Sequence, residues 1–123
     1  MDLSTVVRFH EQWFFVAIAA TGIVGLWGLI TAIAKRELPK AFIWARGIAI
    51  ATMLIQVGAG VILFNSGIVP GNAFHMFYGI VASITLAIAY VYRAQMARKP
   101  ALSYGLLLLF VMGMGFRAWA NVN

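Results

Sequence analysis

Four long apolar runs take up most of this 123-residue chain and constrain its fold more than any other feature. They extend over about residues 13–34, 41–64, 73–92 and 101–118. Each is close to the roughly 20 residues with which an α-helix crosses the hydrocarbon core of a bilayer. The hydrophobic fraction of 63% is far above that of soluble domains. The sequence therefore predicts a single domain, residues 1–123, that lies almost entirely within a membrane.

The connections between the runs are short and contain residues that end helices. Residues 35–40 and 93–100 are charged and contain proline, whereas residues 65–72 are uncharged and rich in turn-forming residues. Short connections make consecutive helices antiparallel neighbours. We therefore expect an all-α, integral-membrane, up-down-up-down four-helix bundle.

The basic residues predict how this bundle is oriented. Seven of the nine Lys and Arg residues belong to the first and third connections and the segments beside them: Lys35, Arg36, Lys40, Arg46, Arg93, Arg98 and Lys99. The opposite end holds only Arg8 and Arg117. Because Lys and Arg concentrate on the cytoplasmic side of membrane proteins, both termini and the 65–72 connection are expected outside.

Composition also excludes several classes of function. The net charge of +6 comes from residues that flank the membrane, so nucleic-acid binding is not expected. The chain has no cysteine, which excludes disulfides, thiolate metal sites and covalent haem attachment. We find no nucleotide-binding glycine loop, no Ser/His/Asp arrangement and no H-E-x-x-H motif. No soluble substrate is evident, and a stand-alone enzyme is not expected.

A few polar side chains within or beside the apolar runs are the candidate functional residues. Gln56 belongs to the second run, His75 and Tyr78 to the third and Arg117 to the fourth, while His10 lies just before the first. Polar groups are costly in hydrocarbon and usually face a partner, so these residues mark where a cofactor would bind.

His10 and His75 are the chain's two histidines, and both are expected near the outer end of the bundle. The first and third helices of such a bundle are diagonal, so their imidazoles would face each other across its axis and could bind haem iron. If the third helix ends at Arg93, the helical rise from the basic far ends places His75 about 10 Å deeper in the bundle than His10. If it continues to Arg98, the two histidines lie at the same depth. Two plainer interpretations remain: a solvated interfacial His10, and a His75 that bonds to a neighbouring helix or caps its own.

Three further residues complete the candidate cofactor site. The guanidinium of Arg117 would pair with Glu11, or bind a haem propionate or a quinone carbonyl. Tyr78 lies one helical turn after His75, and Gln56 one turn before Gly60, whose missing side chain leaves room for a neighbour or ligand.

Two motifs carry a resemblance. His75-x-x-Tyr78-Gly79 at the start of the third helix, with Gly113-x-x-x-Arg117 at the end of the fourth, resembles small four-span proteins of bacterial membranes. This resemblance covers most of the chain, implies location in the bacterial plasma (inner) membrane and implies no particular activity. The architecture is also loosely similar to four-helix b-type cytochromes, in which paired histidines hold haem.

Two functional expectations follow. The first is an accessory subunit of a respiratory or photosynthetic electron-transfer complex, in contact with lipid and with other membrane subunits. The second is a haem b electron-transfer protein with His10 and His75 as ligands of the iron, or a variant that binds a quinone or a chlorophyll-type pigment at the same residues.

Overall fold

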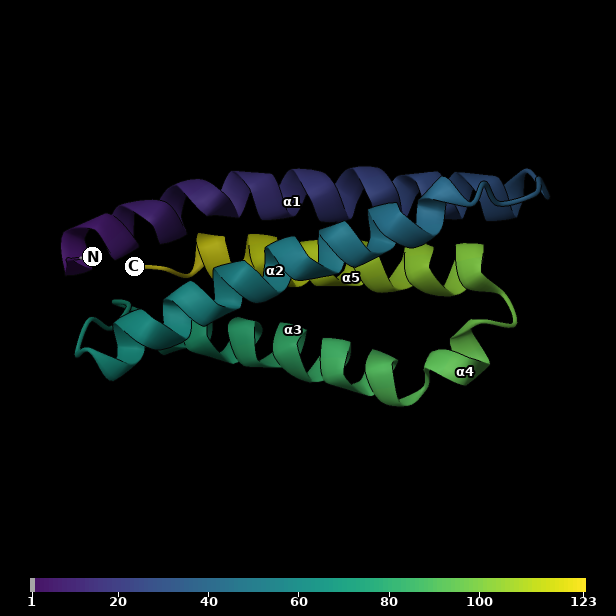
Figure 1. The fold of residues 1–123 in the computed structure, drawn as a ribbon. Helices are drawn as coiled ribbons and strands as arrows, with labels where there is room; N and C mark the ends of the chain where they lie inside the picture. The colour runs from purple at the N-terminus through teal and green to yellow at the C-terminus, as the bar shows by residue number, and fades with distance from the viewer. Residues whose placement is uncertain (1) are drawn as a thin grey trace.

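The computed structural model describes residues 2–123 and consists of helices joined by short connections (Figure 1). The elements are α1 (Leu3–Ile33), α2 (Ala41–Asn65), α3 (Ala73–Val91), the short α4 (Arg93–Met96) and α5 (Pro100–Ala120). The four long helices are each long and apolar enough to cross a membrane. The predicted all-helical architecture with four candidate spans is thus confirmed, and the four apolar runs correspond to α1, α2, α3 and α5.

Helix α1 begins at Leu3, well before the apolar run that starts at Trp13. The carboxylate of Asp2 caps it by accepting hydrogen bonds from the Thr5 amide and from the hydroxyls of Ser4 and Thr5, each at 2.8 Å. These hydrogen bonds, that of the Thr5 amide foremost, hold the pKa of Asp2 below its ordinary value. His10 therefore lies two turns inside a helix and not at its border.

The four long helices do not pack equally. Helix α1 packs along both α2 and α5, and α3 packs along α5, whereas α2 and α3 touch only slightly. Helices α1 and α3 consequently lie across the bundle from each other. Both chain ends and the α2–α3 connection lie at one end of the bundle, and we call this the terminal end (Figure 1).

The third helix is shorter than one that continues to Arg98. Helix α3 ends at Val91, and the separate turn α4 follows it, so there is no continuous helix to Arg98. The far ends of α1 and α3 are also not level, because α1 extends well past α3 (Figure 1). The expected depth difference, which assumed level ends, was therefore wrong.

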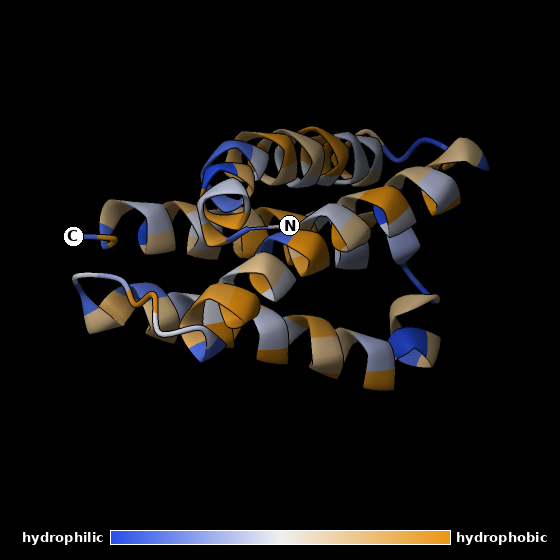
Figure 2. Ribbon diagram, turned by 60° about the vertical axis from the view of Figure 1, so that its left-hand side comes forward, coloured by the Kyte–Doolittle hydropathy of each residue, from blue (hydrophilic) through white to orange (hydrophobic). Residues whose placement is uncertain are grey.

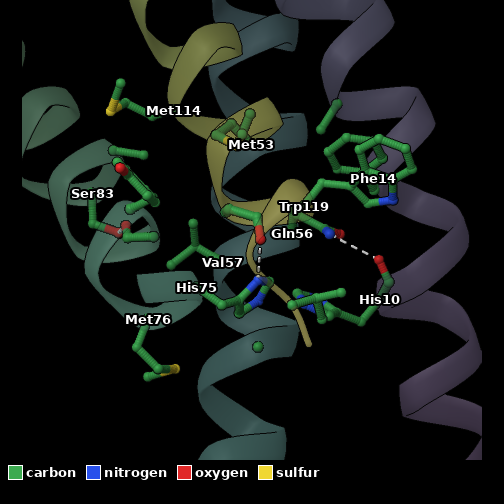
Figure 3. Close-up of a pocket in the computed structure, with 18 of the residues that line it drawn as sticks. His10, Phe14, Met53, Gln56, Val57, His75, Met76, Ser83, Met114 and Trp119 are labelled. Atoms are coloured by element: carbon green, nitrogen blue, oxygen red, sulfur yellow. Dashed lines mark hydrogen bonds between the residues drawn. The ribbon is translucent and has the colours of Figure 1, made fainter. Parts of the chain in front are cut away.

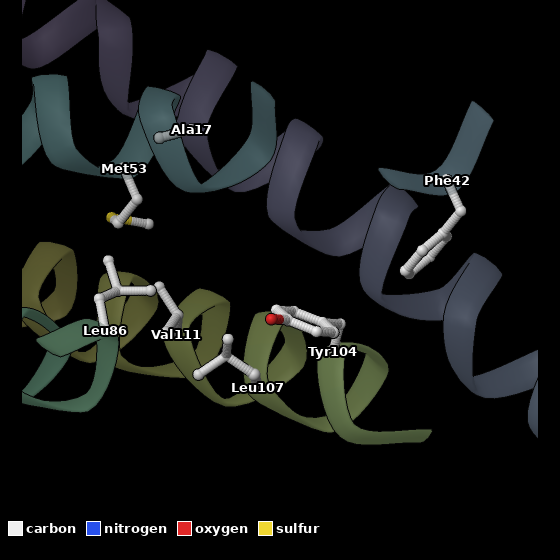
Figure 4. Close-up of a cluster of buried hydrophobic side chains, with 7 residues drawn as sticks. All are labelled: Ala17, Phe42, Met53, Leu86, Tyr104, Leu107 and Val111. Carbon is white, nitrogen blue, oxygen red and sulfur yellow. The ribbon is translucent and has the colours of Figure 1, made fainter. Parts of the chain in front are cut away.

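Many large hydrophobic side chains are exposed on the four long helices, as lipid-facing helices require. Figure 2 shows that apolar residues recur along the helices. Helix α3 is the least covered, since only 11% of its most apolar segment is buried within the protein. Inside, one buried cluster draws on all four long helices (Figure 4). Its members are Ala17, Phe42, Met53, Leu86, Tyr104, Leu107 and Val111.

Glycines bring the backbones of α1 and α5 into direct contact far from the terminal end. A Cβ atom at Gly105 would lie 2.7 Å from the backbone nitrogen of Leu29 and 3.1 Å from the carbonyl oxygen of Gly25. A Cβ atom at Gly28 would lie 2.8 Å from the carbonyl oxygen of Ala101. Small residues allow such approach in lipid, where van der Waals packing holds helices together.

We predict that Gly105→Ala destabilises the bundle by about 1–3 kcal/mol, because the added methyl group meets backbone atoms that cannot move aside. Gly113→Ala is the matched control on the same helix, since its Cβ would meet nothing within 4 Å. Thermal or denaturant unfolding in detergent micelles measures both. Equal stability of the two variants would contradict the close α1–α5 contact.

Candidate functional site

A cavity of about 620 Å³ lies at the terminal end of the bundle. All four long helices line it, and most of its walls are apolar (Figure 3). Its volume falls within the roughly 300–1,000 Å³ of ordinary ligand and cofactor sites. Of the five residues that the sequence singled out, His10, His75, Tyr78 and Gln56 line it. Arg117 does not, but it bonds to Tyr78, which does.

The two histidines meet across the diagonal of the bundle. Their ring centroids lie 6.1 Å apart with an interplanar angle of 82°, although α1 and α3 share no backbone contact. Metal–imidazole bonds are about 2.0–2.1 Å long, so two imidazoles on opposite sides of one ion have centroids roughly 6 Å apart. The observed spacing is therefore compatible with a metal ion held between His10 and His75.

A hydrogen bond to the backbone fixes the ring of His75. Its Nδ1 atom lies 2.7 Å from the carbonyl oxygen of Ala118 on α5. A carbonyl oxygen only accepts, so Nδ1 carries the hydrogen, and in the neutral form of the ring Nε2 presents its lone pair. This is the tautomer that a metal-binding histidine with a carbonyl partner adopts. The same contact also satisfies the plainer interpretation, in which His75 bonds to a neighbouring helix.

His10 is held through its backbone and not through its ring. Its carbonyl oxygen accepts a hydrogen bond of 2.8 Å from Nε2 of Gln56, while its Nδ1 atom is buried without a partner. The ring lies against Gly60, where a Cβ atom would be 3.1 Å from Cε1 of His10. Gly60 thus makes room for this imidazole. The sequence predicted space for a neighbour or ligand beside Gln56, and the ring of His10 occupies it.

Gln56 connects α2 to α1 from within the bundle. It is only 9% exposed, and its Oε1 atom is buried without a hydrogen-bond partner. One turn earlier along α2, the carbonyl oxygen of Thr52 accepts a hydrogen bond of 2.8 Å from the indole of Trp13. Two interhelical hydrogen bonds therefore hold α1 against α2 beside the cavity.

Arg117 pairs with Tyr78 and not with Glu11. Its guanidinium donates a hydrogen bond of 2.9 Å to the Tyr78 hydroxyl and lies 5.2 Å from the centre of the same ring. Within residues 2–123 no ion pair joins Arg117 to Glu11, so that expected pairing is not observed. The pair lies at the terminal end and is exposed. In the sequence Arg117 adjoins Ala118, and Tyr78 follows His75 by one helical turn.

Aromatic side chains pack between α1 and α5 beside the cavity. The ring of Phe14 stacks on Trp119 at 5.7 Å between centroids and lies 6.1 Å from that of Phe116. Phe14 and Trp119 both belong to the cavity lining. These rings thus form part of the apolar wall on the α1 and α5 side.

Several contributors to the site were not found from the sequence. The Ala118 carbonyl contacts His75, and the rings of Phe14 and Trp119 stack, because particular turns of separate helices face each other. The sequence does not specify which turns these are. Trp119 lies near the end of an apolar run, where tryptophan is common at the membrane interface, so its sequence position gives no sign of its place beside the cavity. A sequence signal did exist for Gly60, which lies one turn from Gln56, but it did not identify His10 as the neighbour.

The donor atoms suit a cofactor better than a bare metal ion. Within the described part of the chain, no three His, Asp or Glu side chains group as metal ligands. Two imidazoles alone leave most coordination positions of a metal ion to be filled, and a macrocycle such as a porphyrin fills four of them.

In comparisons with protein-family models, with curated proteins and with solved structures, no match to this chain was found.

We predict that Gly60→Ala displaces the ring of His10 and leaves that of His75 in place, because the new methyl group would lie 3.1 Å from Cε1 of His10. Imidazole NMR signals of histidine-labelled protein measure this, and single histidine variants assign them. Gly58→Ala is the control, since a Cβ atom there meets nothing within 4 Å. Unchanged His10 signals in Gly60→Ala would contradict the placement of this ring.

Proposed function

We propose that this protein is a small electron-transfer subunit of a membrane complex and that it binds haem b between His10 and His75. The convergence of the two imidazoles, 6.1 Å apart within one cavity, carries the proposal. Haem b would supply one-electron chemistry. The protein would supply two imidazole groups to hold it, an apolar enclosure and a fixed orientation.

The residues around the cavity fit a planar, mostly apolar group. His75 offers Nε2 as a ligand, because its Nδ1 is held by the Ala118 carbonyl. On the α3 side, a Cβ atom at Gly79 would meet nothing within 4 Å, so the wall is open there. Apolar walls also favour a buried, low-dielectric setting, which is one of the means by which proteins adjust the potential of a haem.

Arg117 is suited to hold the carboxylates of the haem. Its guanidinium has five N–H donors, and its hydrogen bond to Tyr78 uses only one of them. Planar guanidinium groups bind carboxylates in a bidentate manner. With Arg117 at the terminal end, the propionates would face water while the ring remains in the apolar cavity.

We further propose that the helices cross the bacterial plasma membrane in an up-down-up-down arrangement with both termini outside. The concentration of Lys and Arg at the other end supports this orientation. The haem would then lie near the outer surface. The chain has little mass outside its four long helices, so electrons would be exchanged with partner subunits.

A cofactor-free accessory subunit is the second candidate, and the exposed apolar surface of α3 favours it. Only 11% of the apolar segment of this helix is buried within the protein. A partner subunit would cover this face as readily as lipid. The two candidates differ in whether purified protein carries haem.

We predict that the detergent-purified protein shows haem b bands in a reduced-minus-oxidised spectrum and in pyridine haemochrome analysis. His10→Ala and His75→Ala should each abolish these bands, because each removes one of the two imidazoles that would hold the haem. Thr85→Ala is the control, since that hydroxyl bonds only to Val81 of its own helix. A colourless protein from cells supplied with haem would refute haem binding and favour the accessory subunit.

We also predict that filling the cavity from α3 weakens haem binding without harming the bundle. Gly79→Leu would extend into open space on the cavity wall and should reduce haem affinity at least tenfold, about 1.4 kcal/mol. Gly58→Leu is the matched control, because it too meets nothing within 4 Å but lies outside the cavity lining. Haem titration of both variants measures the difference, and equal affinities would place the haem elsewhere.

A further inference from the structure

Two buried polar atoms beside the cavity lack hydrogen-bond partners, and they complement each other. Nδ1 of His10 and Oε1 of Gln56 are the buried side-chain atoms without a partner within residues 2–123. The amide oxygen of Gln56 can only accept a hydrogen bond, whereas an imidazole Nδ1 can carry a hydrogen and donate it. One atom therefore lacks a donor and the other lacks an acceptor.

The residues that carry these atoms are already in contact. Nε2 of Gln56 donates to the backbone oxygen of His10 at 2.8 Å (Figure 3). Since only the nitrogen of the amide can donate, this bond settles the amide orientation and leaves Oε1 as its free end. Gln56 is 9% exposed, so water has little access to satisfy that oxygen instead.

Near the His10 ring, Gly60, His75 and Glu11 offer no buried acceptor that stays free when haem is bound. Gly60 has no side chain and packs against Cε1 of the ring. His75 uses its Nδ1 atom on the Ala118 carbonyl, and the proposed haem iron would take its Nε2 lone pair. Glu11 follows His10 in the chain and also lines the cavity, but it is exposed. Gln56 is thus the buried neighbour that has a free acceptor.

We infer that Gln56 is the positioning residue of His10: its Oε1 atom accepts the Nδ1 hydrogen of His10 once the ring turns towards it, and so directs the Nε2 lone pair into the cavity. The inference rests on the proposed function for its effect on haem, but not for the tautomer of His10. The Nδ1 atom of His75 bonds to a backbone carbonyl, which no substitution removes. The proposed partner of His10 is the side chain of Gln56, so the basicity of the His10 imidazole is the one that a substitution can change.

Strengthening or weakening this acceptor should shift the haem potential in opposite directions. A stronger acceptor on Nδ1 makes the imidazole a better donor to the metal. Better donation favours oxidised over reduced haem and lowers the reduction potential. Each tenfold change in the relative stability of the two states corresponds to 59 mV for one electron.

The first test needs no haem. Nitrogen NMR of the histidine-labelled His75→Ala variant, prepared without haem, reports the tautomer of His10 alone. We expect hydrogen on Nδ1 in this background and a shift towards hydrogen on Nε2 when Gln56→Met is added. Thr52→Val, one turn away on α2, should change nothing, because that hydroxyl bonds within its own helix. Hydrogen on Nε2 with Gln56 intact would overturn the inference.

The second test is redox titration of the haem-loaded protein with an otherwise intact chain. Gln56→Glu should lower the potential at a pH where the new carboxyl is ionised, Gln56→Met should raise it, and Thr52→Val should leave it unchanged. A purely structural role would shift both Gln56 variants in the same direction, and that result would overturn the inference while haem binding stands. A wild-type protein without haem would refute the proposed function. The tautomer of His10, measured in the first test, would then be the result that decides whether Gln56 positions this ring.

Discussion

The direct backbone contact between α1 and α5 is the constraint on which the rest of the structure depends. Gly28 and Gly105 let the two helices touch where any larger residue would meet backbone atoms. In a membrane no hydrophobic effect drives helices together, so a contact of this kind has to supply the packing. With α1 and α5 joined, α2 is held on one side and α3 on the other, and these two have little contact of their own.

The cavity lies towards the terminal end of the same pair of helices. There the ring of Phe14 on α1 stacks against Trp119 on α5, and both residues line the cavity. His10 and His75 reach the cavity from the two helices that share no backbone contact. A hydrogen bond to the Ala118 carbonyl fixes the ring of His75, and a hydrogen bond from Gln56 holds the backbone of His10.

Much of the fold could be predicted from the sequence, because four apolar runs of membrane-crossing length allow few alternatives. The start of α1 could not, since Asp2 begins the helix by capping, a signal independent of hydrophobicity. Candidate site residues were chosen as polar groups in apolar surroundings, and four of the five line one cavity. Their partners were not all predicted. Arg117 bonds to Tyr78 and not to Glu11. The choice depends on how each helix is rotated about its axis, which short motifs do not determine.

The meeting of His10 and His75 can be measured directly, because the chain has no other histidine. A carbon–carbon correlation spectrum of protein labelled only at histidine, recorded in lipid bilayers by solid-state NMR, reports contacts between the two rings. We expect a cross-peak between them, because the ring centroids lie 6.1 Å apart. It should persist when labelled protein is diluted into unlabelled protein, which excludes contacts between copies. Absence of the cross-peak would show that the imidazoles do not converge and would contradict a shared cofactor.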